Sequence, residues 1–330
     1  MSVKREPSPP APLPTEGEGS PDRDAFPLSL GRERGSGGEG CLPRSHPDTE
    51  WDGRRIRWGE KTLVMAVVNA TPDSFSGDGT GDDVERAANL AMEGEAEGAD
   101  IIDVGAESTR PRHIPIDRDE ELRRLWPVLR AIAARVSVPI SVDTSKAAVA
   151  EAALDAGANL VNDVRGFTRD PELAQVVARR GVPAVLMHDI APDAHGDLVT
   201  SIVRELSRRL DRAVAAGVDW EKLIVDPGFG FGKDWRQNLE ILRRLGDLRV
   251  LGRPILVGFS RKSTIGRVLG LAESDRLEGT LATTAMAIAN GADVVRVHDV
   301  RANVRVARMV DAVVRGAPAE ALTWPGEPPV

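Results

Sequence analysis

Four segments carry residue types that could bind or transform a small molecule, and a fifth, shorter one adds to them. They are Asn69-Ala-Thr-Pro-Asp-Ser-Phe-Ser76, Gly105-Ala-Glu-Ser-Thr-Arg-Pro111, Asp226-Pro-Gly-Phe-Gly-Phe-Gly-Lys233, Gly258-Phe-Ser-Arg-Lys-Ser263 and Arg296-Val-His298-Asp299. With single polar residues elsewhere, they supply two kinds of group. Carboxylates and amides suit a ring with many N–H donors, whereas guanidinium, ammonium and imidazole groups suit anions.

The neutral and acidic set consists of Asp143, Asn162 and Asp226. A buried carboxylate at position 226 can accept paired hydrogen bonds from a planar, amidine-like donor such as an aminopyrimidine ring. The glycines that follow it let backbone and ligand approach closely, and Phe231 can supply an apolar wall. We therefore expect this side of the site to hold a flat ring rich in nitrogen.

The basic set consists of Lys262, Arg296 and His298, with Arg110 nearby. The guanidinium of Arg296 and the imidazole of His298 suit a diphosphate. Ser263 opens an expected helix, and a helix N-terminus with basic neighbours is a ready carboxylate site. Lys262 also fits another chemistry, because a lysine in a barrel can form a Schiff base, as in an aldolase.

The amide oxygen of Asn69 suits a hard cation such as Mg²⁺, which keeps several waters and binds through substrate phosphates. The alternative for this segment is a plain turn at Pro72. Cys41 is the single cysteine of the chain, so a disulfide framework and a cysteine-rich zinc site are both excluded. The sequence has no H-E-x-x-H motif and no Ser-His-Asp order typical of acyl transfer.

Short apolar runs alternate with amphipathic segments from Trp51 onward. Runs that are rich in Val, Ile and Leu and lack polar alternation indicate strands of a covered parallel sheet. They span 63–68, 99–104, 138–142, 159–161, 183–187, 223–225, 254–257 and 293–297, and helical patterns span 83–97, 118–135, 146–156, 171–180, 198–216, 238–245, 277–290 and 304–315. Eight strand–helix pairs predict an α/β fold of the (β/α)₈ TIM-barrel type.

Polar residues follow nearly every expected strand. They are Asn69, Asp103, Asp143, Asn162, Asp163, His188, Asp226, Lys262, Arg296 and His298. In a barrel the carboxyl ends of all strands meet at one mouth, where the active site is built. The simpler alternative is that Asn and Asp at these positions only cap the following helix, and His188 is expected to be packed rather than catalytic.

The segment before the barrel has a different composition. Residues 1–52 are dominated by Pro, Gly, Glu, Arg and Ser, which predicts a disordered N-terminal tail. We expect the barrel domain to span 53–320 and a C-terminal tail to span 321–330. Residues 51–61 are expected to cover the closed end of the barrel.

Bulk properties exclude several classes of function. The net charge is −8, from 43 Lys+Arg and 51 Asp+Glu, so the chain lacks the basic footprint of a nucleic-acid binder and is not expected to bind an anionic membrane. No apolar run reaches the length of a membrane span, and the N-terminus lacks the apolar core of a secretory signal. These features favour a soluble cytoplasmic protein.

In their order along the chain, the segments resemble the motifs of the dihydropteroate synthase family. The resemblance also includes Ser141-Val-Asp-Thr and Asn162-Asp-Val, and it runs from about residue 63 to 312. It implies an enzyme that joins a pterin diphosphate to p-aminobenzoate in folate biosynthesis, with Mg²⁺ as cofactor and a homodimer as the assembly.

The resemblance also implies roles for single residues. Asp143, Asn162 and Asp226 would bind the pterin ring, and Lys262 would reach its oxygen and a ring nitrogen. Asn69 would help to hold magnesium and the diphosphate, together with Arg296, His298 and Thr109. Ser263 would take the carboxylate of p-aminobenzoate, and Phe231 would line its ring. The residues that act in catalysis would be Asp143, Asp226, Lys262, Arg296 and His298.

Four positions depart from the family pattern: Ala70, Ala106, Arg112 and Asp189. They lie beside the motifs, so they bear on loop closure and sulfonamide sensitivity more than on the reaction. Two alternatives share the barrel: a pterin-dependent methyltransferase, which would not need the Ser-Arg-Lys-Ser and Arg-Val-His anion sites, and a silent paralogue that binds pterin without catalysis.

Overall fold

The computed structural model describes residues 46–70, 81–107, 115–191 and 196–316. The chain divides into two units, Met1–Glu39 and Gly40–Val330, and all of the described residues belong to the second. Within the described residues, no helix is both long enough and apolar enough to cross a membrane.

Eight parallel strands form a nearly closed barrel in the order β8-β7-β6-β5-β4-β3-β10-β9. They are β3 (Leu63–Asn69), β4 (Ile101–Gly105), β5 (Ile140–Asp143), β6 (Leu160–Asp163), β7 (Ala184–Met187), β8 (Leu223–Asp226), β9 (Leu256–Val257) and β10 (Val294–Val297). Nearly every strand residue is buried, as expected for strands covered on both faces. The predicted (β/α)₈ TIM barrel is therefore confirmed in its strand number and its parallel order.

The barrel closes between β8 and β9 through one bridge that pairs Val225 with Ile255. The amide of Val225 donates to the carbonyl of Pro254 at 2.9 Å. On the other side of β9, the carboxylate of Asp293 accepts from the amide of Ile255 at 2.9 Å. A side chain thus joins β9 to the start of β10, where the two-residue strand β9 offers few ladder bonds.

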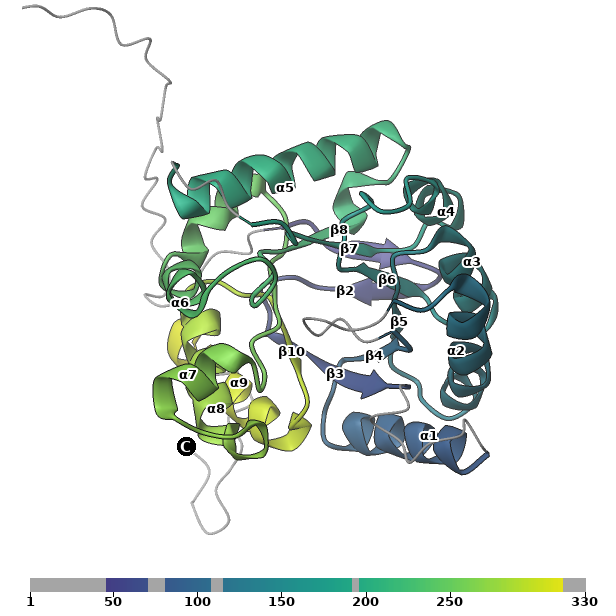
Figure 1. Cartoon of the computed structure of the whole chain (residues 1–330), viewed down its shortest axis with the longest axis horizontal. Helices are drawn as coiled ribbons and strands as arrows, with labels where there is room; N and C mark the ends of the chain where they lie inside the picture. The colour runs from purple at the N-terminus through teal and green to yellow at the C-terminus, as the bar shows by residue number, and fades with distance from the viewer. Residues whose placement is uncertain (1–45, 71–80, 108–114, 192–195, 317–330) are drawn as a thin grey trace, which may run out of the picture. The chain divides into compact units, whose positions relative to one another are not determined.

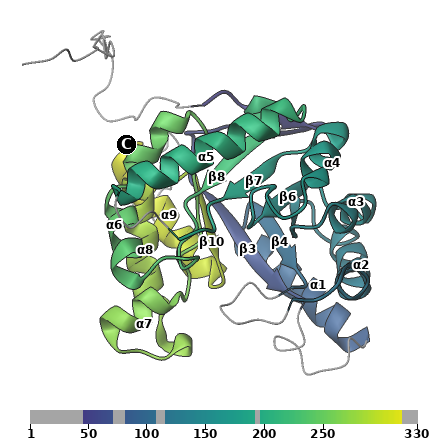
Figure 2. The same cartoon turned by 45° about the horizontal axis from the view of Figure 1, so that its top comes forward.

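Helices follow the strands and cover the outside of the barrel. They are α1 (Gly81–Ala96), α2 (Arg118–Ala133), α3 (Ala147–Asp155), α4 (Glu172–Arg180), α5 (Leu198–Ala215), α6 (Trp235–Arg243), α7 (Ser263–Leu269), α8 (Leu277–Ala289) and α9 (Val300–Val314), with 3₁₀ turns at Trp220–Lys222, Leu245–Leu251 and Glu273–Asp275. Both views show α1 to α4 along one side of the strands and α6 to α9 on the other, with α5 between the two groups (Figures 1 and 2).

Helices α6 and α9 begin earlier than the sequence predicted. Helix α6 begins at Trp235 rather than at the predicted 238, because Asp234 and Gln237 form a capping box. Helix α9 begins at Val300, four residues before the predicted start at 304. After the C-terminal ends of five helices, Gly98, Gly157, Gly181, Gly217 and Gly291 all have positive φ, the conformation in which a glycine stops a helix.

A short antiparallel hairpin, β1 (Thr49–Trp51) and β2 (Arg54–Ile56), precedes the barrel. The hydroxyl of Thr49 donates to the carbonyl of Glu221 at 2.6 Å and accepts from the indole N–H of Trp58 at 2.9 Å. Glu221 lies just before β8, so the hairpin contacts the amino-terminal end of the barrel, in agreement with the cover expected for residues 51–61.

Strand β1 lies within the range 1–52 that the composition assigned to a disordered tail. Thr49 is fully buried and Trp51 is 5% exposed, so these residues pack although polar residues surround them in sequence. The part of the predicted tail before His46 lies outside the described residues, as does the predicted C-terminal tail, 321–330.

We predict that replacing Thr49 with valine destabilises the protein. The change removes a buried hydroxyl and leaves the Glu221 carbonyl and the Trp58 N–H without this partner, at a cost of about 1 to 3 kcal/mol. Denaturant unfolding measures the effect. Thr49→Ser keeps the hydroxyl, so its free energy of unfolding should fall clearly less than that of Thr49→Val. Equal decreases for the two variants would show that the hydrogen bonds do not anchor the hairpin.

Candidate active site at the carboxyl ends of the strands

The polar residues that end the expected strands do lie at one end of the barrel. In the strand register, Gly105 is opposite Asp143, Asp143 is opposite Asn162, and Met187 is opposite Asp226. Asn69 ends β3 and is half-buried. The strand topology therefore brings residues that are far apart in sequence to a common mouth, as the sequence predicted.

A guanidinium sits among carboxylates in this mouth. Arg296 donates from Nε to Asp103 Oδ2 at 2.6 Å and from Nη2 to Asp143 Oδ2 at 3.0 Å. Asn162 Nδ2 donates to the same oxygen of Asp103 at 3.2 Å. Asp103, Asp143 and Asn162 are all buried. One charged network therefore joins β4, β5, β6 and β10.

Burial changes the protonation of the two carboxylates that were predicted to bind a ring. Desolvation raises the pKa of Asp143 to about 7, with Arg296 acting in the opposite direction. Desolvation also raises the pKa of Asp226 to about 6, opposed by the Gly228 N–H bond and by Lys262, Lys233 and Arg296. The positive charges of Lys262 and Arg296 both act to lower the pKa of Asp226, so these three side chains interact electrostatically.

The loop after β8 folds tightly around Asp226. The carboxylate accepts from the amide of Gly228 at 2.7 Å. Gly228 has φ +72, and a Cβ at this position would lie 1.9 Å from the carbonyl oxygen of His188. Only glycine fits here, which explains the residue after Asp226-Pro. Further along the loop, the ring of Phe231 lies 4.6 Å from the ammonium of Lys262.

The loop after β9 contributes a second group of side chains. The hydroxyl of Ser260 lies 3.0 Å from His298 Nδ1 and accepts from the His298 amide at 3.2 Å. Arg261, at φ +56, forms a bidentate pair with Asp299. Ser263 is the first residue of α7 and is exposed, as is His298. The β9 and β10 ends are thus tied together by side chains.

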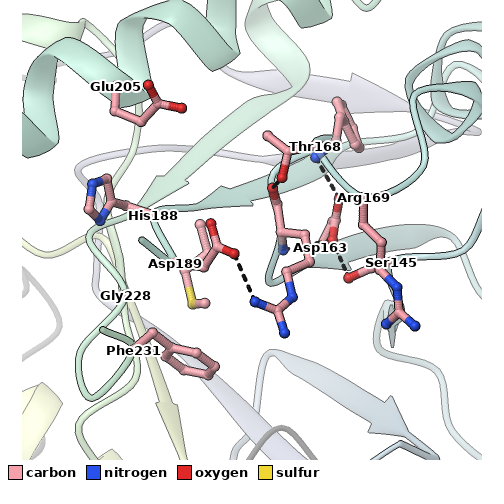
Figure 3. A network of polar contacts seen from close by, with 12 residues as sticks. Ser145, Asp163, Thr168, Arg169, His188, Asp189, Glu205, Gly228 and Phe231 are labelled. Atoms are coloured by element: carbon pink, nitrogen blue, oxygen red, sulfur yellow. Dashed lines mark hydrogen bonds and ion pairs between the residues drawn. The ribbon is translucent and has the colours of Figure 1, made fainter. Parts of the chain in front are cut away.

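A small cavity of about 20 Å³ opens beside this network. It is lined by Glu107, Glu121, Asp143, Thr144, Ser145, Val164, Arg165 and Arg169. Along its wall Asp163 accepts from Ser145 at 2.6 Å, and Asp189 is bonded by Arg165 at 2.9 Å (Figure 3). Asp143 belongs to both the network and the cavity wall, so the cavity borders the buried polar groups.

The structure differs from the sequence analysis in how it arranges the charges. The sequence separated an acidic set from a basic set, but Arg296 of the basic set contacts Asp143 of the acidic set. Asp103 was noted only as a polar residue at a strand end, and its pairing with Arg296 was missed. The pairing follows from the strand register, in which Asp103 lies opposite Ser141, two residues before Asp143, and the sequence alone does not give this register.

Other predicted residues are placed as follows. His188 is packed, with 1% exposure, as expected. Thr109, Arg110 and Arg112 lie outside the described residues. The described residues contain no group of three or more His, Cys, Asp or Glu side chains that could hold a metal ion.

Comparison with known proteins agrees with this arrangement. A family model described as pterin binding enzyme matches residues 65–298. The fold and the mouth of the barrel therefore define a pterin-binding barrel enzyme.

Individual relatives show to which family of pterin-binding enzymes the chain is most similar in sequence and structure. The dihydropteroate synthase of Clostridium beijerinckii is 46% identical over 258 residues, covering 78% of this chain and 96% of that protein. The Bacillus subtilis dihydropteroate synthase is 45% identical over 259 residues, covering 78% and 91%. The crystal structure of the Clostridium difficile enzyme in the presence of pteroic acid matches with a TM-score of 0.77 at 46% identity, covering 79% of this chain and 99% of that one. The chain belongs to the dihydropteroate synthase family.

We predict that Gly228→Ala costs much more stability than Gly270→Ala. Both glycines have nearly the same φ, +72 and +71, but a Cβ at Gly270 meets nothing within 4 Å. Backbone strain alone should cost about 1 to 2 kcal/mol at position 270, and the added clash should bring position 228 to about 2 to 5 kcal/mol. Equal free energies of unfolding for the two variants would contradict the close approach of Gly228 to His188.

Proposed function

We propose that the chain condenses 6-hydroxymethyl-7,8-dihydropterin diphosphate with p-aminobenzoate, giving 7,8-dihydropteroate and diphosphate. The observation that carries this proposal is the set of buried acceptors, Asp143, Asn162 and Asp226, at neighbouring strand ends. The titles of two Xanthomonas albilineans dihydropteroate synthase structures name 4-aminobenzoic acid and 7,8-dihydropteroate as bound ligands.

The pterin ring is assigned to the acidic part of the mouth. Asp143, Asn162 and Asp226 would accept hydrogen bonds from its amino and ring N–H groups, and Lys262 would donate to its oxygen and a ring nitrogen. The Gly228 amide and the Arg296 guanidinium already hold the two carboxylates in place. Little reorganisation is then needed when the ring binds.

The diphosphate is assigned to the basic groups at the rim. His298 is exposed and held by Ser260, so it can donate to a phosphate oxygen. Arg296 would contribute its charge from the ion-pair network, and Asn69 its amide oxygen. Thr109, which the family resemblance assigns to the same group, lies outside the described residues.

Magnesium fits this site in a limited way. The described residues have no cluster of acidic or imidazole ligands for a metal held by protein alone, but Mg²⁺ usually takes one or two protein oxygens and completes its shell with water and substrate phosphates. Asn69, at the end of β3, offers one such oxygen. When bound, the ion would supply positive charge to the departing diphosphate.

In the reaction, the bond between the pterin methylene carbon and the diphosphate oxygen breaks, and the electron pair leaves with the diphosphate. Positive charge spreads from the methylene into the ring, where ionised Asp143 and Asp226 stabilise it. The amine of p-aminobenzoate forms the new carbon–nitrogen bond and loses a proton. Ser263 would bind the carboxylate of this second substrate, and Phe231 would pack on its ring. No covalent intermediate with the enzyme is required, so positioning and charge supply the catalysis.

We further propose that the barrel with its β1–β2 hairpin is the catalytic domain, and that the protein works in the cytoplasm as a homodimer. Helices α8 and α9 pack against each other and expose Met286, Met309 and Val313 at 50%, 65% and 71%. Apolar side chains this exposed favour a protein partner for these helices.

We predict that Asp226→Ala lowers dihydropteroate formation by about a hundredfold or more, since a preorganised electrostatic contact to the reacting ring is lost. Asp226→Asn keeps an acceptor for Gly228 but not the charge, so it should lie between the alanine variant and the wild type. Asp155→Ala, an exposed position on α3, is the control. The assay combines purified protein, magnesium and both substrates; no product from the wild type, or full activity of Asp226→Ala, would refute the assignment.

We also predict that pterin binding releases protons at pH 6. The pKa values of about 7 and 6 mean that the unliganded site holds protons there, whereas N–H donors of the ring favour the ionised carboxylates. Pterin affinity should therefore rise from pH 5 to 8 and then level off. Calorimetry in buffers of different ionisation enthalpy measures the release; proton uptake at pH 6 would contradict it.

The same pKa values have a consequence for stability in the absence of ligand. A raised carboxyl pKa means that the folded chain retains protons that the unfolded chain gives up. These two groups therefore favour folding less and less as the pH rises from about 4 to 7.

A further inference from the structure

Lys233, the last residue of the Asp226–Lys233 segment, has no role in the reaction proposed above. Its side chain is 9% exposed, and its ammonium donates to three backbone carbonyls: His188 at 3.0 Å, Gly228 at 3.1 Å and Phe231 at 2.9 Å. An ammonium has three N–H donors, and each of these three carbonyls can take one. The nitrogen is therefore the centre of a tripod.

The three carbonyls belong to two different loops. His188 follows β7, whereas Gly228 and Phe231 follow β8. The loops touch through backbone as well, because a Cβ on Gly232 would lie 2.7 Å from the amide nitrogen of Ala191. Figure 3 shows Gly228 between His188 and Phe231. Lys233 thus bonds together two loops that are already in backbone contact.

The β7 side of this contact is itself anchored. Asp189, next to His188, pairs with Arg165 at 2.9 Å and with Arg209 at 2.8 Å. Arg209 is 1% exposed and also donates to the carbonyl of Arg165 at 3.0 Å. Because Arg209 lies on α5, the loop after β7 is fixed to a long helix. Lys233 extends this support to the loop after β8.

Nearby acids partly compensate for the burial of the Lys233 charge. Burial lowers its pKa to about 7, while Asp226 and Asp189 act in the opposite direction. Burial is the larger of the two effects on this pKa, so the two carboxylates offset only part of the cost of burying the cation. The three carbonyl acceptors favour the protonated form as well, because only the ammonium has three N–H donors.

The other end of the β8 loop faces the site. The carbonyl of Phe231 is held by the tripod, and its ring lies 4.6 Å from the ammonium of Lys262. A Cβ on Gly230 would lie 3.4 Å from Lys262 Cδ, so the loop backbone also approaches this side chain. The position of the Phe231 ring is therefore set from the backbone that Lys233 bonds.

We propose that Lys233 is a positioning residue that sets the Phe231 ring against Lys262 and so presets the wall on which the p-aminobenzoate ring packs. The inference rests on the proposed function. Asp226 has its own bond to Gly228 at the end of β8, upstream of the Phe231 carbonyl. Loss of the tripod should thus affect the second substrate more than the pterin.

The main test is Lys233→Met, which keeps much of the length and apolar volume but no donor. With saturating pterin diphosphate, KM for p-aminobenzoate should rise about tenfold or more, because a small misplacement of a contact is costly. Pterin binding should be measured alone by calorimetry at pH 8, well above the pKa of about 6 of Asp226, so that loss of the Lys233 charge does not change the ionisation of that carboxylate. Under these conditions it should change less than about threefold, a split that a general loss of structure would not give. Lys222→Met, a lysine at the opposite end of β8, is the matched control and should behave as wild type.

Two further variants distinguish the hydrogen-bond geometry of Lys233 from its charge. They also keep the inference testable if Lys233→Met does not fold. Lys233→Arg keeps the charge, but a planar guanidinium cannot present three donors from one nitrogen, so it should show the same split. Gly232→Ala leaves Lys233 intact and disturbs the same loop contact, and it should also raise KM for p-aminobenzoate selectively.

Several results would overturn the inference. One is an unchanged KM for p-aminobenzoate in a folded Lys233→Met variant, and another is full activity of Lys233→Arg. A third is a parallel increase in KM for both substrates in all folded variants. These results leave the proposed function standing, because the wild type still makes product. If the wild type makes no product, the proposed function fails, and direct calorimetric binding of p-aminobenzoate to wild type and variants with pterin present still decides the role of Lys233.

Discussion

The ion pairs between Arg296 and two carboxylates organise the mouth of the barrel. Asp103 and Asp143 come from adjacent strands, and two acids this close would disfavour each other's ionisation without a cation between them. Arg296 reaches them from β10, and Asn162 bonds the same oxygen of Asp103. The polar groups on three strands, β4, β5 and β6, therefore depend on one guanidinium, either directly or through Asp103. A buried charge that lost its partner here would destabilise the mouth as a whole.

This network also gives Asp143 its intermediate protonation. Burial favours the neutral acid, whereas Arg296 favours the carboxylate. In the proposed reaction, a ring that brings N–H donors would tip the balance toward the ion, which is the form that would stabilise a cationic ring. Binding and activation would thus be coupled through the same atoms.

The sequence predicted the barrel and the common mouth, because short apolar runs and helix-ending glycines have simple local signatures. All eight strands were found, and Asp143, Asn162 and Asp226 lie where strand ends meet. The charge pairing was not predictable in this way. Arg296 and Asp103 are separated by 193 positions, and their contact depends on the register of three strands. Lys233 was likewise missed, since its partners are backbone carbonyls that no residue type reveals; Gly228 and Gly232 were the available signs of close loop packing.

The closure of the barrel at β9 has a consequence for how the site moves. Strand β9 has two residues, and a single bridge links it toward β8, so this seam has fewer ladder bonds to hold it than the neighbouring β7–β8 pair. Thermal opening is easiest where few hydrogen bonds must break together. The seam separates the strand that carries Asp226 from the one that leads to Lys262. A bound molecule that touches both Asp226 and Lys262 would link the two sides of the β8–β9 seam and oppose its opening. Hydrogen exchange at the amide of Val225 would then slow, although no ligand atom touches that residue.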